Sequence, residues 1–279
     1  MAPTWACTLA TCPIESSLFG YRPSLAANTF FLSLFGLCTL AQTFELVLWR
    51  SHTFSIPIII GGLCEVIGYV GRVMLYNNPF SQDGFLIQIC CLTIGPAFYS
   101  AAIYFCIADI VKRFGPHASR LRPGQYAWIF IPCDIISLIL QGAGGGVASM
   151  AVQSDGDPKP GTNVMVAGLV FQVCSLLAFI LLTLEFVWRA RATRSAANGA
   201  GWGTEKTSTR NRKLWLFGLP FSLAVLCIFI RCAFRVAELS NGWTGGLIKH
   251  ENTFIGLEGA VIAVSAIALN IAHPKLLST

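Results

Sequence analysis

The stretch that decides the fold is Cys64-Glu65-Val66-Ile67-Gly68-Tyr69-Val70-Gly71-Arg72, which places a carboxylate and a guanidinium inside an apolar run. That run covers 54–76 and is long enough to cross a bilayer as a helix. Glu65 falls about 16 Å from its start and Arg72 about 10 Å further on, at roughly 1.5 Å per residue, so both lie on one face. Because ionised groups in hydrocarbon are costly unless paired or wetted, that face is expected to point into a helical bundle.

The composition is that of a membrane protein. Of 279 residues, 54% are hydrophobic and 11% are charged, against about 25% charged residues in a soluble domain. We therefore expect an all-α polytopic membrane protein, with an N-terminal segment at 1–24, a membrane domain at 25–273 and a short tail at 274–279. Apolar windows predict seven transmembrane helices, at 25–48, 54–76, 85–110, 125–150, 164–188, 214–238 and 252–273.

Basic residues predict the orientation of these spans. The loops on one side hold thirteen Lys and Arg residues, and those on the other side hold only Arg22, Lys159 and Lys249. Since basic loops remain in the cytosol, the N-terminus is expected outside and the C-terminus in the cytosol. The basic, Ser/Thr/Gly-rich segment 189–213 predicts a flexible cytosolic loop. No signal peptide is expected, and the protein is predicted to be a multi-pass protein of the plasma membrane or an endomembrane.

Several kinds of site are not indicated. The net charge of +6 belongs mostly to the expected cytosolic face, so it does not point to nucleic acid. The glycine run at 144–146 lacks the Lys-Ser/Thr of a phosphate loop and is expected to let a helix or ligand approach the backbone. No ATP-binding motif is present in the sequence. No metal site or cofactor is predicted, because the histidines at 52, 117, 250 and 273 lie at span ends or in loops. Nine of 11 cysteines lie in predicted spans, and a disulfide between Cys7 and Cys12 is left open.

Polar residues recur in other spans at helical spacing. Asp134 and Gln141 are seven residues apart, as are Glu251 and Glu258. Counted from the span ends, most of these positions fall in the outer half of the bilayer, while Glu65 lies near the middle and Asp134 deeper. Converging faces would form a polar cavity that opens outward above an acidic floor. The candidate substrate-binding residues are Glu65, Arg72, Asp134, Gln141, Arg231, Arg235, Glu238, Glu251 and Glu258.

Linked motifs run in a fixed order along nearly the whole chain: Glu65 through Arg72, Gly95-Pro96-Ala97-Phe98 with Tyr104, Asp134 through Gln141 to Gly144-Gly145-Gly146, Arg231, Phe234-Arg235, Glu238, Gly242, His250-Glu251 and His273-Pro274. Together they resemble the fungal lipid-translocating exporter family, also called the resistance-to-aminocholesterol family. The resemblance implies a seven-helix protein associated with export or flipping of sphingoid bases and other lipids, and with resistance to lipophilic toxic compounds. The family usually has Asp and Tyr where this chain has Glu258 and Ile255, so a hydroxyl is missing from the expected cavity wall.

The leading hypothesis is a translocase for lipids or lipophilic amphiphiles. Arginine suits a phosphate or carboxylate through planar paired hydrogen bonds, and Glu65, Asp134 or Glu258 suits an ammonium. Without an ATP-binding motif in this chain, uphill export would need an ion gradient or a partner. The structural alternative is that the acids only neutralise the arginines and hold the bundle in register.

Two other classes remain open. A membrane-embedded enzyme could use Glu65 and Asp134 as catalytic acids or bases for cyclisation, isomerisation or hydrolysis of a lipid-like substrate. A seven-helix receptor is the third class, against which stand the short tail and Asp109 in place of the usual cytosolic arginine motif. The expected partner is a membrane lipid or lipophilic small molecule, and the sequence does not indicate an oligomeric state.

Overall fold

The structure is a computed structural model that describes residues 13–14, 17, 19–114, 119–153, 156–198, 205–240 and 251–274. In these ranges seven helices are long and apolar enough to cross a membrane. The seventh is composite, since its first turns are followed by a wider π-helical segment. The elements are α1 (Leu25–Trp49), α2 (His52–Asn77), α3 (Gln82–Phe114), α4 (Pro123–Gln153), α5 (Lys159–Asn198), α6 (Glu205–Ser240), α7 (Glu251–Thr253), the π-helical segment Phe254–Ala260 and α8 (Val261–Ile271).

The seven predicted spans are confirmed, and α5 and α6 exceed them. The segment 189–213, predicted as a flexible loop, is helical over 189–198 and 205–213. An ion pair of 2.6 Å between Arg189 and Glu185, one turn apart, supports the start of this extension. A stable apolar helix also propagates easily into polar residues, because only its nucleus is costly. The orientation remains a prediction, and Cys7, Cys12, Gly242 and His250 lie outside the described residues.

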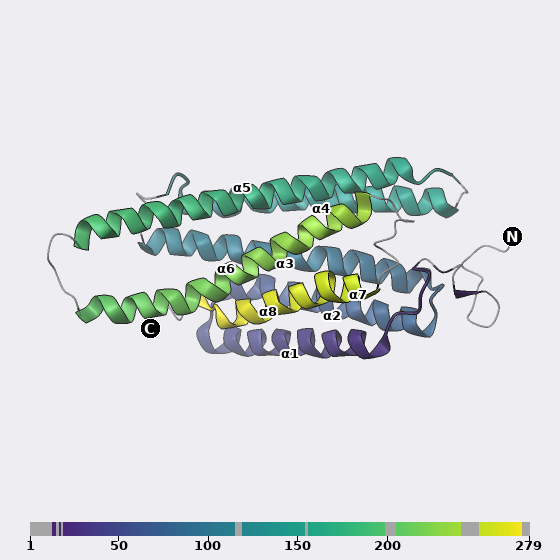
Figure 1. Cartoon of the computed structure of the whole chain (residues 1–279), viewed down its shortest axis with the longest axis horizontal. Helices are drawn as coiled ribbons and strands as arrows, with labels where there is room; N and C mark the ends of the chain where they lie inside the picture. The colour runs from purple at the N-terminus through teal and green to yellow at the C-terminus, as the bar shows by residue number, and fades with distance from the viewer. Residues whose placement is uncertain are drawn as a thin grey trace.

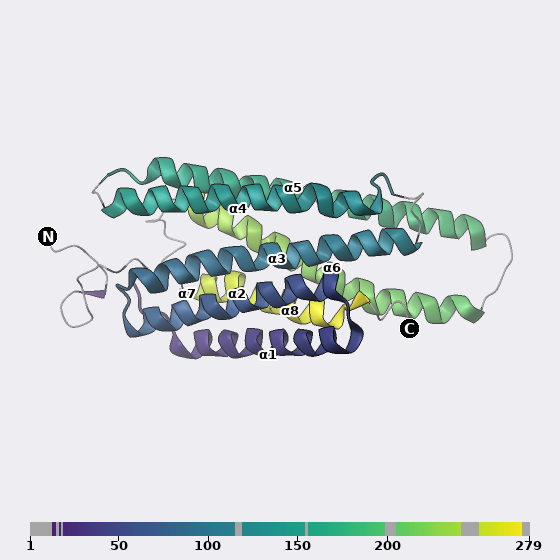
Figure 2. The same ribbon diagram turned by 180° about the vertical axis from the view of Figure 1, so that it is seen from behind.

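The helices form three groups across the bundle (Figure 1). The antiparallel pair α4 and α5 lies along one side, α1, α2 and α8 lie along the other, and α3 and α6 run between them, as the view from behind also shows (Figure 2). The starts of α1, α3, α5 and α7 and the ends of α2, α4 and α6 gather at the same end of the bundle (Figures 1 and 2). We call this end the N-terminal end of the bundle.

Glycines let α2 and α3 pack closely. A Cβ at Gly61 would lie 2.9 Å from the carbonyl oxygen of Gly95, and a Cβ at Gly71 would lie 2.8 Å from that of Gly84. Membrane helices approach closely where such small residues meet. The same seam accommodates Glu65, because a Cβ at Gly95 would lie 2.6 Å from its Oε1. Two extended apolar helices thereby enclose a carboxylate between them.

The pair α4 and α5 depends on a second close approach. A Cβ at Gly144 would lie 2.5 Å from the backbone nitrogen of Met165 and 2.6 Å from the carbonyl oxygen of Gly161. The expectation that the glycine run admits a helix is thus confirmed at Gly144. Gly142, half a turn away, has nothing within 4 Å of its Cβ position.

Replacing Gly144 with Val is expected to reduce the yield of monodisperse protein in detergent severalfold, because the side chain forces the α4 and α5 backbones apart. Overpacking of this kind costs roughly 1–3 kcal/mol or more. Size-exclusion chromatography of a fluorescent fusion measures the loss. The matched control, Gly142→Val, is expected to behave like the wild type. Equal yields for both variants would contradict the assigned helix contact.

Candidate functional site

Seven Asp, Glu, Lys or Arg side chains are buried in the described part of the chain. They come from α2, α4, α6 and the π-helical segment, whereas the outer helix faces carry exposed apolar side chains such as Leu40 and Val47. Four carboxylates accompany three guanidinium groups, so the formal charge is −1 when all are ionised. We call this set the ionic cluster; it comprises Glu65, Arg72, Asp134, Arg231, Arg235, Glu238 and Glu258.

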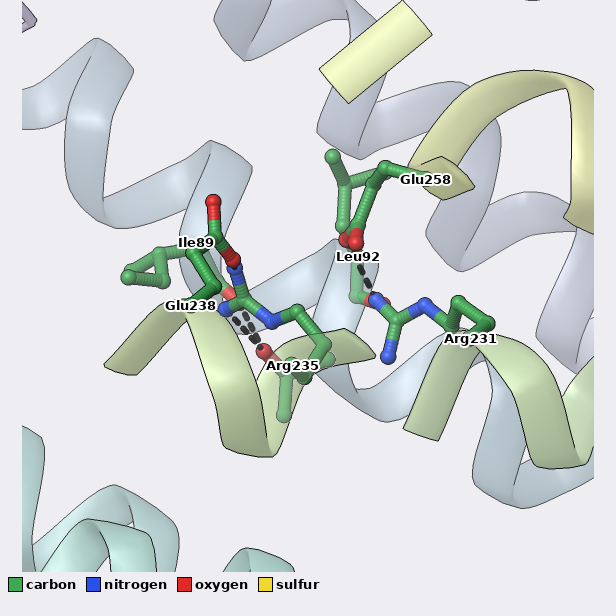
Figure 3. A network of polar contacts seen from close by, with 7 residues as sticks. Ile89, Leu92, Arg231, Arg235, Glu238 and Glu258 are labelled. Atoms are coloured by element: carbon green, nitrogen blue, oxygen red, sulfur yellow. Dashed lines mark hydrogen bonds and ion pairs between the residues drawn. The ribbon is translucent and has the colours of Figure 1, made fainter. Parts of the chain in front are cut away.

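The ion pair at the centre of the cluster joins α6 to the seventh span. Nη2 of Arg231 lies 2.6 Å from Oε1 of Glu258, and both side chains are only 3% exposed. The same nitrogen donates to the carbonyl oxygen of Leu92 on α3 (Figure 3). That carbonyl is available because residue 96, four positions later, is Pro and has no N–H to donate to it. Arg231 therefore ties three elements together.

The π-helical segment positions the carboxylate of this pair. At its end Val261 donates its N–H to the carbonyl oxygen of Gly256, which is five residues earlier rather than four. The wider turn carries Glu258, and its neighbour Gly259 lies against α1 and α2, where a Cβ would be 2.6 Å from the Phe31 ring. The sequence predicted an ordinary helix here. Single π-turns within membrane and soluble helices are frequent at functional sites.

A second ion pair lies nearer the N-terminal end. Nη1 of Arg235 lies 2.7 Å from Oε2 of Glu238 one turn later on α6. Nη2 of the same arginine donates to Thr93 Oγ1 over 3.4 Å. Figure 3 shows Arg231 and Arg235 projecting from successive turns of α6. Arg235 also interacts electrostatically with Glu258, so the two pairs form one network.

Two carboxylates of the cluster have no ion-pair partner among the described residues. Oε1 of Glu65 is buried without a hydrogen-bond partner there, although Arg231 and Glu258 are close enough to interact electrostatically. Asp134 accepts a 3.0 Å hydrogen bond from the Tyr104 hydroxyl on α3, while its Oδ1 has no partner in the described part. Cys232, which follows Arg231 on α6, lies close to Asp134, and this places Asp134 beside the network.

The cluster has an order in depth. At roughly 1.5 Å per residue, Arg72 and Arg235 lie about 8 Å along their helices from the N-terminal end. On the same measure Arg231 lies about 14 Å, Glu65 about 18 Å and Asp134 about 29 Å from it. Glu65 and Asp134, the carboxylates without an ion-pair partner in the described ranges, are therefore deeper in the bundle than the paired Arg231 and Arg235.

Two candidate residues lie elsewhere. Gln141 donates to Gln172 of α5 over 3.0 Å and to Ser137 over 2.6 Å, so it belongs to the α4–α5 contact. This contact also turns Gln172 of α5 inward, where it is 5% exposed. Glu251 accepts a hydrogen bond from the backbone of Ser24 at the start of α1. The seven-residue spacing predicted that Gln141 shares a helix face with Asp134, and Glu251 with Glu258. It did not predict which neighbouring helix each residue contacts.

The sequence did not single out several partners of the cluster. Asn28 accepts a 3.3 Å hydrogen bond from Nε of Arg72, and the Phe254 ring lies 3.8 Å from the Arg72 Cζ. A polar residue inside span 25–48 was the available signal for Asn28. Pro96 was the signal for a free carbonyl at Leu92. Phe254 gave no signal beyond being apolar.

Metal binding finds no support in the described ranges, where no three His, Cys, Asp or Glu residues are placed to hold an ion. The cluster combines acids with arginines, and the contacts that it makes are ion pairs and hydrogen bonds within an apolar bundle.

A bundle of seven apolar helices around buried, partly paired charges defines a polytopic membrane protein with a charged interior. The chain belongs to the family described as RTA1 like protein, whose model matches residues 58–279. The resemblance inferred from the sequence motifs is thereby confirmed.

Three relatives illustrate the range of the family. The sphingoid long-chain base transporter RSB1 of Saccharomyces cerevisiae is 34% identical over 284 residues, covering 93% of this chain and 74% of that protein. Protein RTM1 of Saccharomyces cerevisiae is 26% identical, covering 82% of this chain and 70% of RTM1. The lipid-translocating exporter-like protein RTA1 of Leptosphaeria maculans is 24% identical, covering 94% of this chain and 52% of RTA1. No solved structure matches the chain.

Proposed function

We propose that this protein translocates amphiphiles with a cationic headgroup, of the sphingoid-base type, across the membrane. The similarity to RSB1, which is named as a sphingoid long-chain base transporter, extends over 93% of the chain and supports this class of substrate. A sphingoid base carries one ammonium, neighbouring hydroxyls and one long alkyl chain. It therefore needs a buried anionic acceptor beside an apolar path.

The observation that carries the proposal is the pair of carboxylates without a counter-cation. Oε1 of Glu65 and Oδ1 of Asp134 are buried acceptors that have no partner in the described part of the chain. An ammonium has three donors and one positive charge, which complements either of these atoms and the formal −1 of the ionic cluster. In this proposal the pair Arg231–Glu258 holds the helices in register beside the headgroup.

We infer the route and the coupling from the order in depth. We place the N-terminal end outside, as the basic loops predict, so the ammonium leaves the carboxylates past Arg235 and Glu238 toward the outer surface. A proton arriving at Glu65 or Asp134 would then replace the ammonium and balance the charge. Export would draw on this exchange, since no ATP-binding motif is present in the sequence.

The test uses a yeast strain that lacks RSB1 and expresses the chain at its surface. Cells are loaded with an isotopically labelled sphingoid base, and its release to albumin in the medium is measured. We expect faster release and better survival than with an empty vector. The matched control substrate is the N-acylated base, which has no charge and is expected not to be exported.

Equal release with and without surface-expressed protein would contradict the proposal. Mass analysis of the released lipid separates the enzyme alternative, because a transporter returns the base unchanged whereas acid/base catalysis at Glu65 or Asp134 alters its mass or retention time. Release of altered product by purified protein would therefore favour the enzyme.

A further inference from the structure

Arg72 is the arginine of the ionic cluster that has no carboxylate partner among the described residues. Its side chain is 0% exposed. Nε donates to Oδ1 of Asn28 over 3.3 Å, whereas Nη1 and Nη2 are buried and have no hydrogen-bond partner in the described ranges. The other two arginines each pair with a glutamate. The two terminal nitrogens of this guanidinium are thus left without an acceptor in the described part of the chain.

Aromatic rings fix the orientation of the group. Its Cζ lies 3.8 Å from the centroid of the Phe254 ring and 5.6 Å from that of Phe19. Phe19 is itself held by the Phe85 ring of α3, at 5.7 Å between centroids. With its Cζ over the Phe254 ring and Asn28 at Nε, the guanidinium leaves Nη1 and Nη2 for a further acceptor.

The rings alone do not offset the burial of this charge. A cation–π contact offsets only part of the cost of taking an ion out of water, even after relaxation. The single neutral hydrogen bond to Asn28 adds less than an ionic partner would. A bound anion would offset the rest of the cost of burying the Arg72 charge. Arg22 brings a second guanidinium to the end of α2, where its Nε donates to the Tyr76 carbonyl oxygen over 2.9 Å.

We propose that Arg72 binds the phosphate group of an amphiphile through paired hydrogen bonds from Nη1 and Nη2. A planar fork matches phosphate geometry better than a single ammonium does. The depth is suitable, because Arg72 lies about 8 Å from the end of α2 and each headgroup layer of a bilayer is roughly 5–8 Å thick. The phosphate of a single-chain lipid would meet Arg72 while its chain follows the apolar interior.

The test measures binding to purified protein in a non-ionic detergent by thermal-shift titration. The probes are lysophosphatidic acid and the monoacylglycerol of the same chain length, which differ only in the phosphate. We expect lysophosphatidic acid to stabilise the wild type and the monoacylglycerol to have no comparable effect. Arg72→Gln is expected to weaken the apparent Kd at least tenfold, and Arg72→Lys, which keeps the charge but loses the fork, roughly tenfold.

The matched control is Arg120→Gln, which removes an exposed arginine from the opposite end of the bundle and is expected to bind like the wild type. Competition by inorganic phosphate would support the same site with free phosphate as its source, and its failure to compete would assign the site to lipid phosphate. Unchanged affinity in Arg72→Lys, or equal loss in Arg120→Gln, would overturn the proposal. Because lysophosphatidic acid has no amine, failure here leaves the proposed ammonium site untouched, and the reverse also holds.

Discussion

Export of a labelled sphingoid base is expected to fall roughly 10- to 100-fold when Glu65 is replaced by Gln. The substitution keeps the size of the side chain and removes its charge. A charge-assisted hydrogen bond contributes about 1.5–3 kcal/mol, and each 1.4 kcal/mol corresponds to about tenfold in affinity. The change also brings the formal charge of the ionic cluster from −1 to zero, so the cluster no longer balances the charge of an ammonium.

The measurement is the release assay in yeast, normalised to protein at the cell surface. Glu185→Gln is the matched control, because this glutamate pairs with Arg120 and Arg189 at the opposite end of the bundle, where these arginines are 63% and 41% exposed. It is expected to export at the wild-type rate. Wild-type export by Glu65→Gln would remove this carboxylate from substrate recognition.

The second large effect concerns stability. Replacing Arg231 with Met is expected to destabilise the folded protein by about 3–5 kcal/mol, because Glu258 is left buried without its partner. In the double variant Arg231→Met/Glu258→Met neither charge remains, and about half of this loss is expected to disappear. A residual loss of about 1–3 kcal/mol remains, since the Leu92 carbonyl also loses its donor.

Thermal unfolding in detergent, run as a double-mutant cycle, measures the coupling between the two side chains. Arg120→Met provides the control, because its pair with Glu185 is exposed and is expected to contribute at most about 1 kcal/mol. A double variant that is no more stable than Arg231→Met alone would show that the ion pair is not the reason for the loss.

The spans were predictable from the sequence because the length of an apolar run is a direct physical requirement of the bilayer. Membership of the ionic cluster was predictable for the same reason, since charges inside such runs must face the bundle. All seven buried ions, from Glu65 to Glu258, were identified in this way. The helical extensions of α5 and α6 were missed, because polar composition alone indicates neither helix nor loop once a stable helix precedes it.

Pairing was beyond the sequence because it depends on which helices become neighbours. Gln141 shares a face with Asp134, yet it meets Gln172 of α5 while Asp134 meets Tyr104 of α3. The π-helical turn at Glu258 is accompanied by close packing of Gly259 against Phe31 of α1 and Tyr69 of α2, which are distant in the sequence. The free carbonyl of Leu92 was predictable, since Pro96 removes its helical donor. The arginine that donates to this carbonyl was not, because it lies 139 residues away in the sequence.

The most direct test of the central claim is an experimental structure of the protein with a sphingoid base bound. The account predicts the amino nitrogen inside the bundle, within about 3 Å of a carboxylate oxygen of Glu65 or Asp134. An amino nitrogen that lies outside the bundle, or that contacts only the paired Glu238, would contradict it.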